Sequence, residues 1–209
     1  MDLAKIWDLP DVQDFIQTIE REYRCDDFSF LDDKPYISQI DYDGATKIVF
    51  LSDSWDFVFK VAKYDCSRNY CELEMKNYQA AKEFNVQKIF LETALFWTFG
   101  NGLELYIQPK FDFTCWDYLQ YHNGRSTLKR KLNNYGTKNT TKAWNGMYDS
   151  SRINLYWFSR VIQLYGKKFV YSLELFSQKQ KMGDLHMSNI GWKDKKPVIF
   201  DYAGYFEDD

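Results

Sequence analysis

Apolar residues recur at helical spacing near the start of the chain and then gather in short runs. Residues 10–23 place apolar side chains three and four positions apart, after a proline and an aspartate that suit a first helical turn. Three runs rich in β-branched and aromatic residues follow at 36–40, 47–51 and 57–62, with turn residues between them. This pattern predicts an amphipathic helix and then three antiparallel strands in a meander.

Helical spacing returns over residues 68–84. One stripe of this helix carries Cys71, Glu74, Tyr78 and Ala81, which directs the carboxylate of Glu74 inward. A buried carboxylate requires a cation as its partner. The spacing therefore predicts a basic residue facing Glu74.

Further apolar runs follow at 89–91, 94–99 and 103–107. Asn101 and Gly102, between the last two runs, form a pair typical of a hairpin turn. We expect these runs to supply the fourth and fifth strands of a small sheet, which makes the fold class α+β.

The second half of the chain reads as helices joined by a long polar segment. Helical stripes cover residues 152–165 and 169–176, with a break at Gly166, and a short helix is expected over 114–121. Residues 123–151 are rich in Asn, Thr, Gly, Ser and basic side chains. That segment is either a solvated loop or a surface for an acidic substrate or a partner protein.

Composition narrows the class of protein. A length of 209 residues suits one domain or two small lobes. The net charge of -3 does not favour binding to nucleic acid or to an anionic membrane. Its four cysteines form no C-x-x-C pair and it has two histidines, which argues against a zinc site or a disulfide framework. Without an apolar stretch of membrane length or a signal peptide, the sequence predicts a soluble cytoplasmic protein.

Candidate chemistry lies in the last quarter of the chain. A loop offers Asp184 and, five positions on, Asn189, and the apolar run 197–200 then leads to Asp201 in a turn ending at Gly204. Carboxylate and amide oxygens suit Mg²⁺, and phosphoryl transfer needs neutralised charge and an oriented hydroxyl. The alternative is a turn in which these side chains only cap backbone groups.

The wording G-D-L-H-x-x-N-I-G, followed by D-Y-A-G, resembles the catalytic loop and metal-binding turn of the protein-kinase-like superfamily. It looks more like the aminoglycoside phosphotransferase and minimal bacterial or phage branch than like eukaryotic kinases. The resemblance spans residues 36–204 and implies a two-lobe fold. Residues 1–108 would form an N-terminal helix and a lobe with a five-stranded antiparallel sheet, and residues 109–209 a shortened helical lobe.

The same resemblance implies roles for the residues in the second half of the site. Asp184 would orient the acceptor hydroxyl, and Asn189 and Asp201 would bind Mg²⁺. His186 is expected to be structural, and Met182 stands where the superfamily usually has a histidine.

In the first half of the site, the resemblance implies that Lys60 holds the phosphates of ATP and pairs with Glu74. Glu72 is the other candidate partner, although Lys76 lies four positions after it. A simpler interpretation of Lys60 is an edge-strand lysine facing water.

Gly44 and the segment 108–111 complete the implied nucleotide site. Gly44 is the one glycine in the first hairpin, where kinases have a glycine-rich loop, and Gln108 and Lys110 lie in the implied hinge that contacts adenine. A plain strand end explains residues 108–111 equally well. The sequence stops five residues after Gly204, so we expect no activation segment.

These residues together predict an ATP- and Mg²⁺-dependent phosphotransferase. The preferred acceptor is a protein Ser or Thr hydroxyl, and a small molecule is the alternative acceptor. The alternative is a catalytically weak or inactive kinase-like module, of the kind a phage encodes, that binds and modulates a host protein. Adenylate transfer by the same metal ligands is a third hypothesis.

Overall fold

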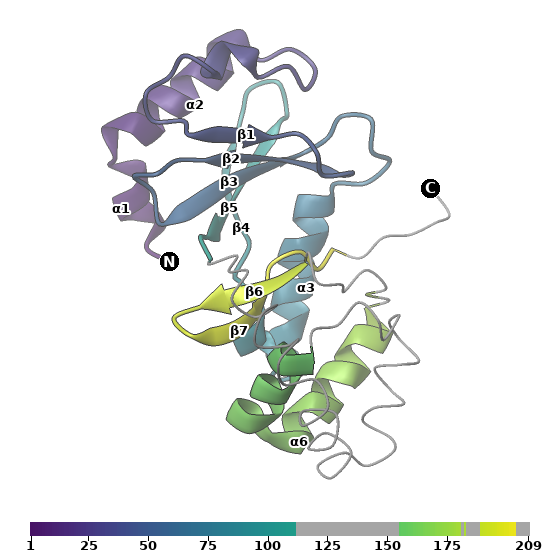
Figure 1. Ribbon diagram of the computed structural model, residues 1–209. Coiled ribbons are helices and arrows are strands. Elements are labelled where there is room, and N and C mark those ends of the chain that lie inside the picture. Colours follow the sequence, from purple (N-terminus) through teal and green to yellow (C-terminus); the bar gives the residue numbers. More distant parts are fainter. Residues whose placement is uncertain (112–154, 181, 183–188, 204–209) are drawn as a thin grey trace. The chain divides into compact units, whose positions relative to one another are not determined.

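The computed structural model describes residues 1–111, 155–180, 182 and 189–203, and the chain divides into two compact units (Figure 1). The first unit comprises residues 1–75 and 92–110, and the second comprises 76–91 and 111–209. The boundary predicted between residues 108 and 109 differs from this division in residues 109–110, which belong to the first unit, and in residues 76–91. That segment belongs to the second unit because Ala81, Val86 and Ile89 pack in its core.

The first unit is an antiparallel sheet of five strands in the order β1-β2-β3-β5-β4, with helices beside it (Figure 1). The predicted α+β class and five-stranded sheet are therefore confirmed. Its elements, with the helix that leads out of it, are α1 (Leu3–Trp7), α2 (Pro10–Glu22), η1 (Ser29–Leu31), β1 (Gln39–Asp41), β2 (Lys47–Leu51), β3 (Phe57–Ala62), α3 (Tyr70–Glu83), β4 (Ala94–Thr98) and β5 (Glu104–Pro109).

Two elements of this unit differ from the sequence prediction. The first strand covers Gln39–Asp41 instead of residues 36–40, because Tyr36 and Ile37 pack against the apolar core from the segment before the strand. The short helix α1 was not predicted, since its five residues cover fewer than two helical turns, too few to show a repeating apolar stripe.

The two faces of the sheet differ in polarity. Register places Ile48 opposite Val61 and Phe50 opposite Phe59, and these side chains form one apolar face. Helix α2 covers that face, and the ring of Phe15 stacks on Phe59 with centroids 5.2 Å apart. Because successive residues of a strand point to opposite faces, the residues between them face the other way.

The second unit contains α6 (Leu155–Lys179), the 3-10 helix η2 (Gln87–Ile89) and a hairpin of β6 (Ile190–Lys193) and β7 (Lys196–Ile199). The predicted break in α6 is present, since Gly166 has a φ of 80° and a ψ of 170°. Strand β6 was not predicted. At the turn of the hairpin Asp194 and Lys195 adopt positive φ values of 51° and 61°, as tight hairpin turns require.

Several predicted features lie outside the described residues. They are the helix over 114–121, the basic segment 123–151, Asp184, His186 and Gly204.

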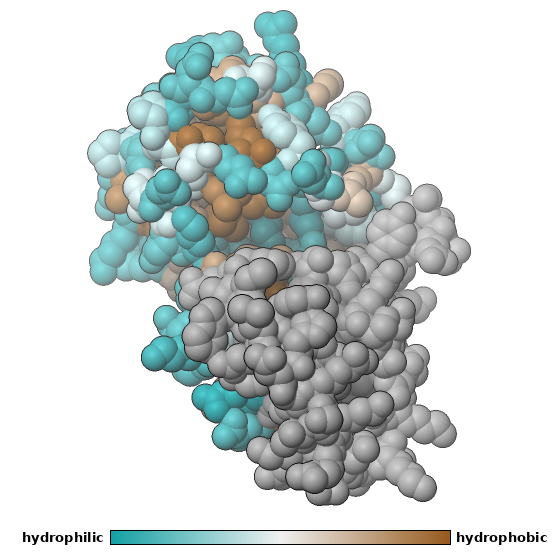
Figure 2. Space-filling model, in the orientation of Figure 1, coloured by the Kyte–Doolittle hydropathy of each residue, from teal (hydrophilic) through white to brown (hydrophobic). Residues whose placement is uncertain are grey.

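Polar side chains dominate the face of the first unit drawn in Figure 2, around a smaller hydrophobic area. This sorting follows from the amphipathic helices and the sheet, which direct their apolar sides into a core. Among the described helices, none combines the length and the apolar character needed to cross a membrane.

Candidate functional site

A carboxylate of α3 lies between two ammonium groups of the sheet. Glu74 is fully buried, with 0% of its side chain exposed. Its Oε2 accepts a hydrogen bond from Lys60 Nζ at 3.2 Å, and its Oε1 accepts one from Lys47 Nζ at 2.6 Å. The structure thus contains the predicted pair of Lys60 with Glu74, and it adds a second lysine that the sequence analysis did not single out.

Strand register explains why two lysines meet one carboxylate. Lys60 of β3 lies opposite Val49 of β2, and Lys47 lies opposite Ala62, so both lysines belong to the same face of neighbouring strands. This is the face turned away from α2. Helix α3 supplies Glu74. Cys71, one turn earlier on the same stripe of the helix, is also fully buried, as the helical spacing predicts.

The sequence of β2 indicates which face of the sheet Lys47 occupies, but its partner there is known only from the strand register. It begins a strand whose alternate residues, Ile48 and Phe50, are apolar and buried. Because side chains alternate between the two faces of a strand, Lys47 lies on the face opposite to Ile48 and Phe50. Which cross-strand residue it meets there depends on the pairing of β2 with β3, which a single strand does not specify.

Two neutral side chains extend the charged cluster. Thr93 Oγ1 donates to Glu74 Oε2 at 3.2 Å, and Gln108 Nε2 donates to Thr93 Oγ1 at 2.9 Å. Both residues are buried. Gln108, predicted as a hinge residue, thus has a side chain ordered by the same network that holds Lys60. We call Lys47, Lys60, Glu74, Thr93 and Gln108 the Glu74 cluster.

The other two predicted nucleotide contacts lie in ordinary structural settings. Lys110 donates from its backbone N to Asp56 O at 2.8 Å and from Nζ to Ser52 O at 2.9 Å. Gly44 is exposed in the connection between β1 and β2, where an added Cβ would come within 3.1 Å of Lys47 O. That close approach to backbone favours glycine at this turn.

The Glu74 cluster provides fixed positive charge in a place shielded from water. Lys60 and Lys47 have side-chain exposures of 5% and 6%. Buried ions are tolerated only when close counter-ions and hydrogen bonds satisfy them, and such groups are held rigidly. An ammonium held in this way is suited to binding the oxygens of an anionic substrate group.

The second unit holds two predicted metal ligands at one end of a hairpin. Asn189 precedes β6 and Asp201 follows β7 by two positions, and Ile190 pairs with Ile199 between them. Phe200 N donates to Asn189 O at 3.0 Å, which extends the ladder toward Asp201. Asn189 is buried and Asp201 is half-buried. Asp184, the predicted catalytic carboxylate, lies outside the described residues.

The donor chemistry of this pair fits Mg²⁺. This ion takes oxygen ligands, keeps several waters, and is typically held by one or two carboxylates together with substrate phosphates. Asn189 and Asp201 supply an amide oxygen and a carboxylate. Across the described part of the chain, no group of three or more His, Cys, Asp or Glu residues is arranged to hold a metal ion.

Tyr202 anchors the segment that carries Asp201. Asn77 Nδ2 donates to Tyr202 O at 2.9 Å, and the hydroxyl of Tyr202 donates to Leu91 O at 2.5 Å. Leu91 N in turn donates to Ile199 O at 2.9 Å. None of these supporting residues could be identified from the sequence, because their partners lie more than 100 positions away along the chain.

Comparison with known proteins adds no family to this description. No family model matches the chain, and neither a curated protein nor a solved structure does.

Proposed function

We propose that this protein is an ATP- and Mg²⁺-dependent phosphotransferase of kinase-like two-lobe fold, which moves the γ-phosphate to a hydroxyl of a protein Ser or Thr. The observation that supports this best is the buried pair of Lys60 with Glu74, at 3.2 Å. The kinase resemblance requires a lysine of the third strand to meet a glutamate of the following helix. These two residues come from β3 and α3.

Each site residue has a role in the proposal. Lys60 binds the phosphates of ATP, and Glu74 orients its ammonium. Asn189 and Asp201 hold Mg²⁺, which neutralises phosphate charge when it is bound, and Asp184 orients the acceptor hydroxyl. Phosphoryl transfer depends mainly on such positioning and charge stabilisation, so no covalent intermediate is needed. Gln108, Lys110 and Gly44 are the proposed contacts to the rest of the nucleotide.

One observation favours a second candidate function. Both oxygens of Glu74 accept hydrogen bonds, and Lys47 makes the shorter of the two ion pairs. A cluster of this kind also stabilises the contact between α3 and the sheet without any nucleotide. The second candidate is therefore a kinase-like module, catalytically weak or inactive, that binds and modulates a host protein.

The decisive experiment supplies Mg²⁺ with ATP labelled at the γ-phosphate or, separately, at the α-phosphate. We expect label from the γ position on protein, and we expect Asp184→Ala to abolish it. Transfer of the α-phosphate label to protein would indicate adenylate transfer instead of phosphotransfer. Absence of both labels would favour the binding module.

Nucleotide binding is tested separately by thermal unfolding. A ligand that binds only the folded state raises the melting temperature by mass action. We expect Mg²⁺ with ATP to raise it, and expect Lys60→Met and Asp201→Asn each to remove the shift. Lys168→Met, at an exposed position of α6, is the control that keeps the shift. An unchanged melting curve of the unaltered protein at saturating nucleotide would contradict the proposed site.

A further inference from the structure

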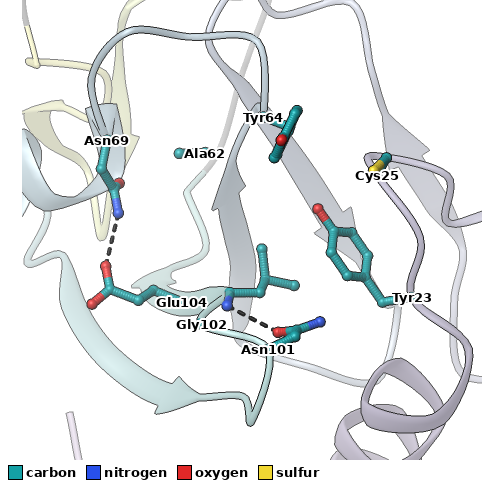
Figure 3. Close-up of a pocket in the computed structure, with 9 residues that line it drawn as sticks. Tyr23, Cys25, Ala62, Tyr64, Asn69, Asn101, Gly102 and Glu104 are labelled. Carbon is teal, nitrogen blue, oxygen red and sulfur yellow. Dashed lines mark hydrogen bonds between the residues drawn. The ribbon is translucent and has the colours of Figure 1, made fainter.

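A cavity of about 300 Å³ opens on the first unit, and the proposed phosphotransfer uses none of its residues (Figure 3). It lies between the segment after α2, the end of β3, the residue before α3 and the turn that joins β4 to β5. The residues that line it include Tyr23, Ala62, Tyr64, Asn69, Leu103 and Glu104.

Glu104 is held in place by two neutral donors. Its Oε2 accepts hydrogen bonds from the hydroxyl of Tyr106 at 2.6 Å and from Asn69 Nδ2 at 2.8 Å, the second of which Figure 3 draws. Asn69 is itself fixed, because its Oδ1 accepts from Glu72 N at 2.9 Å at the start of α3. Burial and the neighbouring carboxylate raise the pKa of Tyr106, so its hydroxyl stays a neutral donor.

No basic side chain neutralises this carboxylate within the described residues. The salt bridges of that part of the chain join other acidic groups, and none reaches Glu104. Glu104 is half-buried, so its charge is only partly hydrated. A carboxylate that is oriented by its neighbours and lies at a cavity wall is prepared to meet a cation from outside.

Two tyrosine rings form other parts of the wall. Figure 3 shows Tyr23 and Tyr64 around the same space as Glu104. Asp26 contacts both residues: its N donates to the hydroxyl of Tyr23 at 3.4 Å, and its Oδ2 accepts from Tyr64 N at 2.7 Å. Tyr64 is 76% exposed, which places its ring at the mouth of the cavity. Aromatic faces attract ammonium and guanidinium groups.

We propose that this cavity binds an organic cation through one alkylammonium or guanidinium group, which pairs with Glu104 and contacts the rings of Tyr23 and Tyr64. The apolar side chains of Ala62 and Leu103 would contact the carbon chain next to the charge. The volume is at the low end for ligand pockets, so it suits a small amine or a single basic side chain.

Calorimetric titration with cadaverine and agmatine tests the proposal, with 1-pentanol as the neutral probe. We expect both amines to bind and the alcohol not to. Glu104→Gln keeps an oxygen for Tyr106 and Asn69 but removes the charge, and we expect about tenfold weaker binding of the amines. Tyr64→Ala, at an exposed position, is expected to weaken binding several-fold through loss of the ring.

Glu83→Gln is the matched control, because it changes net charge equally at an exposed position of α3. It should leave amine binding unchanged. Equal amine affinity of the unaltered protein and Glu104→Gln would overturn the proposal, as would equal binding of 1-pentanol or no binding of either amine. ATP is absent throughout, so these outcomes are independent of the proposed phosphotransfer.

Discussion

At the scale of single residues, Glu74 is expected to have a large effect on the free energy of unfolding, because it makes two ion pairs while its side chain is fully buried. Removing water from three charged groups is costly, and only close mutual contacts offset that cost. The contacts at 2.6 Å and 3.2 Å meet this condition. Breaking such an arrangement from one side costs far more than the arrangement contributes when it is intact.

Glu74→Gln should therefore lower the free energy of unfolding by about 3–5 kcal/mol, because two buried ammonium groups lose their shared negative charge. Urea denaturation followed by tryptophan fluorescence measures the loss. Glu83→Gln, exposed on the same helix, should change stability by less than about 0.5 kcal/mol. Equal stabilities of the two variants would show that the charge of Glu74 is not required.

Asp14 of α2 provides a contrasting carboxylate near the surface. Its Oδ2 accepts hydrogen bonds from Lys34 Nζ at 2.8 Å and from the hydroxyl of Tyr36 at 2.7 Å. These bonds hold the pKa of Asp14 below its usual value of 3.8, with the bond from Lys34 as the largest cause. A lowered pKa in the folded state means that this carboxylate contributes stability at higher pH and loses it in acid.

We expect Asp14→Asn to lower stability by about 0.2–1 kcal/mol at neutral pH, a range typical of exposed ion pairs. The deficit should be constant above the ordinary pKa of 3.8 and should shrink as pH falls through the lower pKa of the folded state. Urea denaturation of both proteins across that range measures it. Asp53→Asn, at an exposed residue, is the control, and a deficit for Asp14→Asn that does not change with pH would contradict the assignment.

At the scale of elements, α6 illustrates how one residue divides a helix. Gly166 adopts a φ of 80° and a ψ of 170°, a backbone conformation that is strongly disfavoured for residues with a Cβ. The chain resumes helical geometry afterwards, and Val161 and Leu173, on either side of the break, are both buried in the core of the second unit. The break therefore lets two helical segments direct their apolar sides into the same core.

Gly166→Ala distinguishes a required break from a weak helix position by the sign of its effect. An added Cβ meets nothing within 4 Å, so backbone strain alone should destabilise the protein, by about 1–3 kcal/mol. Thermal unfolding followed by circular dichroism measures it. Lys167→Ala, exposed in the same helix, should have little effect. A stabilising Gly166→Ala would mean that the helix prefers to be continuous, as glycine-to-alanine changes in regular helices do.

At the scale of the whole molecule, each unit has its own apolar core. In the first unit α2 packs on one face of the sheet, with Phe15, Phe50 and Phe59 fully buried. In the second unit the core gathers residues from α3, α6 and the end of the chain. Tyr202 belongs to this second core, and its hydrogen bonds join a late residue to Asn77 and Leu91.

Tyr202→Phe should reduce the stability of the second unit by about 1–2 kcal/mol, because the buried carbonyl of Leu91 loses the hydroxyl that donates to it. Denaturation followed by circular dichroism measures the loss. Tyr171→Phe makes the same chemical change at a residue that is 59% exposed, and it should be nearly neutral. Equal effects of the two substitutions would show that the hydroxyl of Tyr202 makes no specific contribution.

Local pattern was sufficient to place most elements of the first unit. Runs rich in β-branched and aromatic residues located β2 and β3 at the observed bounds, and helical spacing located α2 and α3 to within two residues. The inward stripe of α3 also selected Glu74 over Glu72 as the partner of Lys60. These inferences succeeded because strand-favouring composition and the helical period of 3.6 residues are local properties, so a short segment reveals them.

The amino-acid pattern therefore located α2, α3, β2 and β3, and it indicated that Glu74 points inward. Tertiary structure decided that Lys47 shares this carboxylate and that Glu104, Asn69 and Tyr106 assemble beside a cavity. The physical reason is that strand pairing and helix docking join residues distant along the chain. No local period specifies which of several possible registers brings two such side chains together.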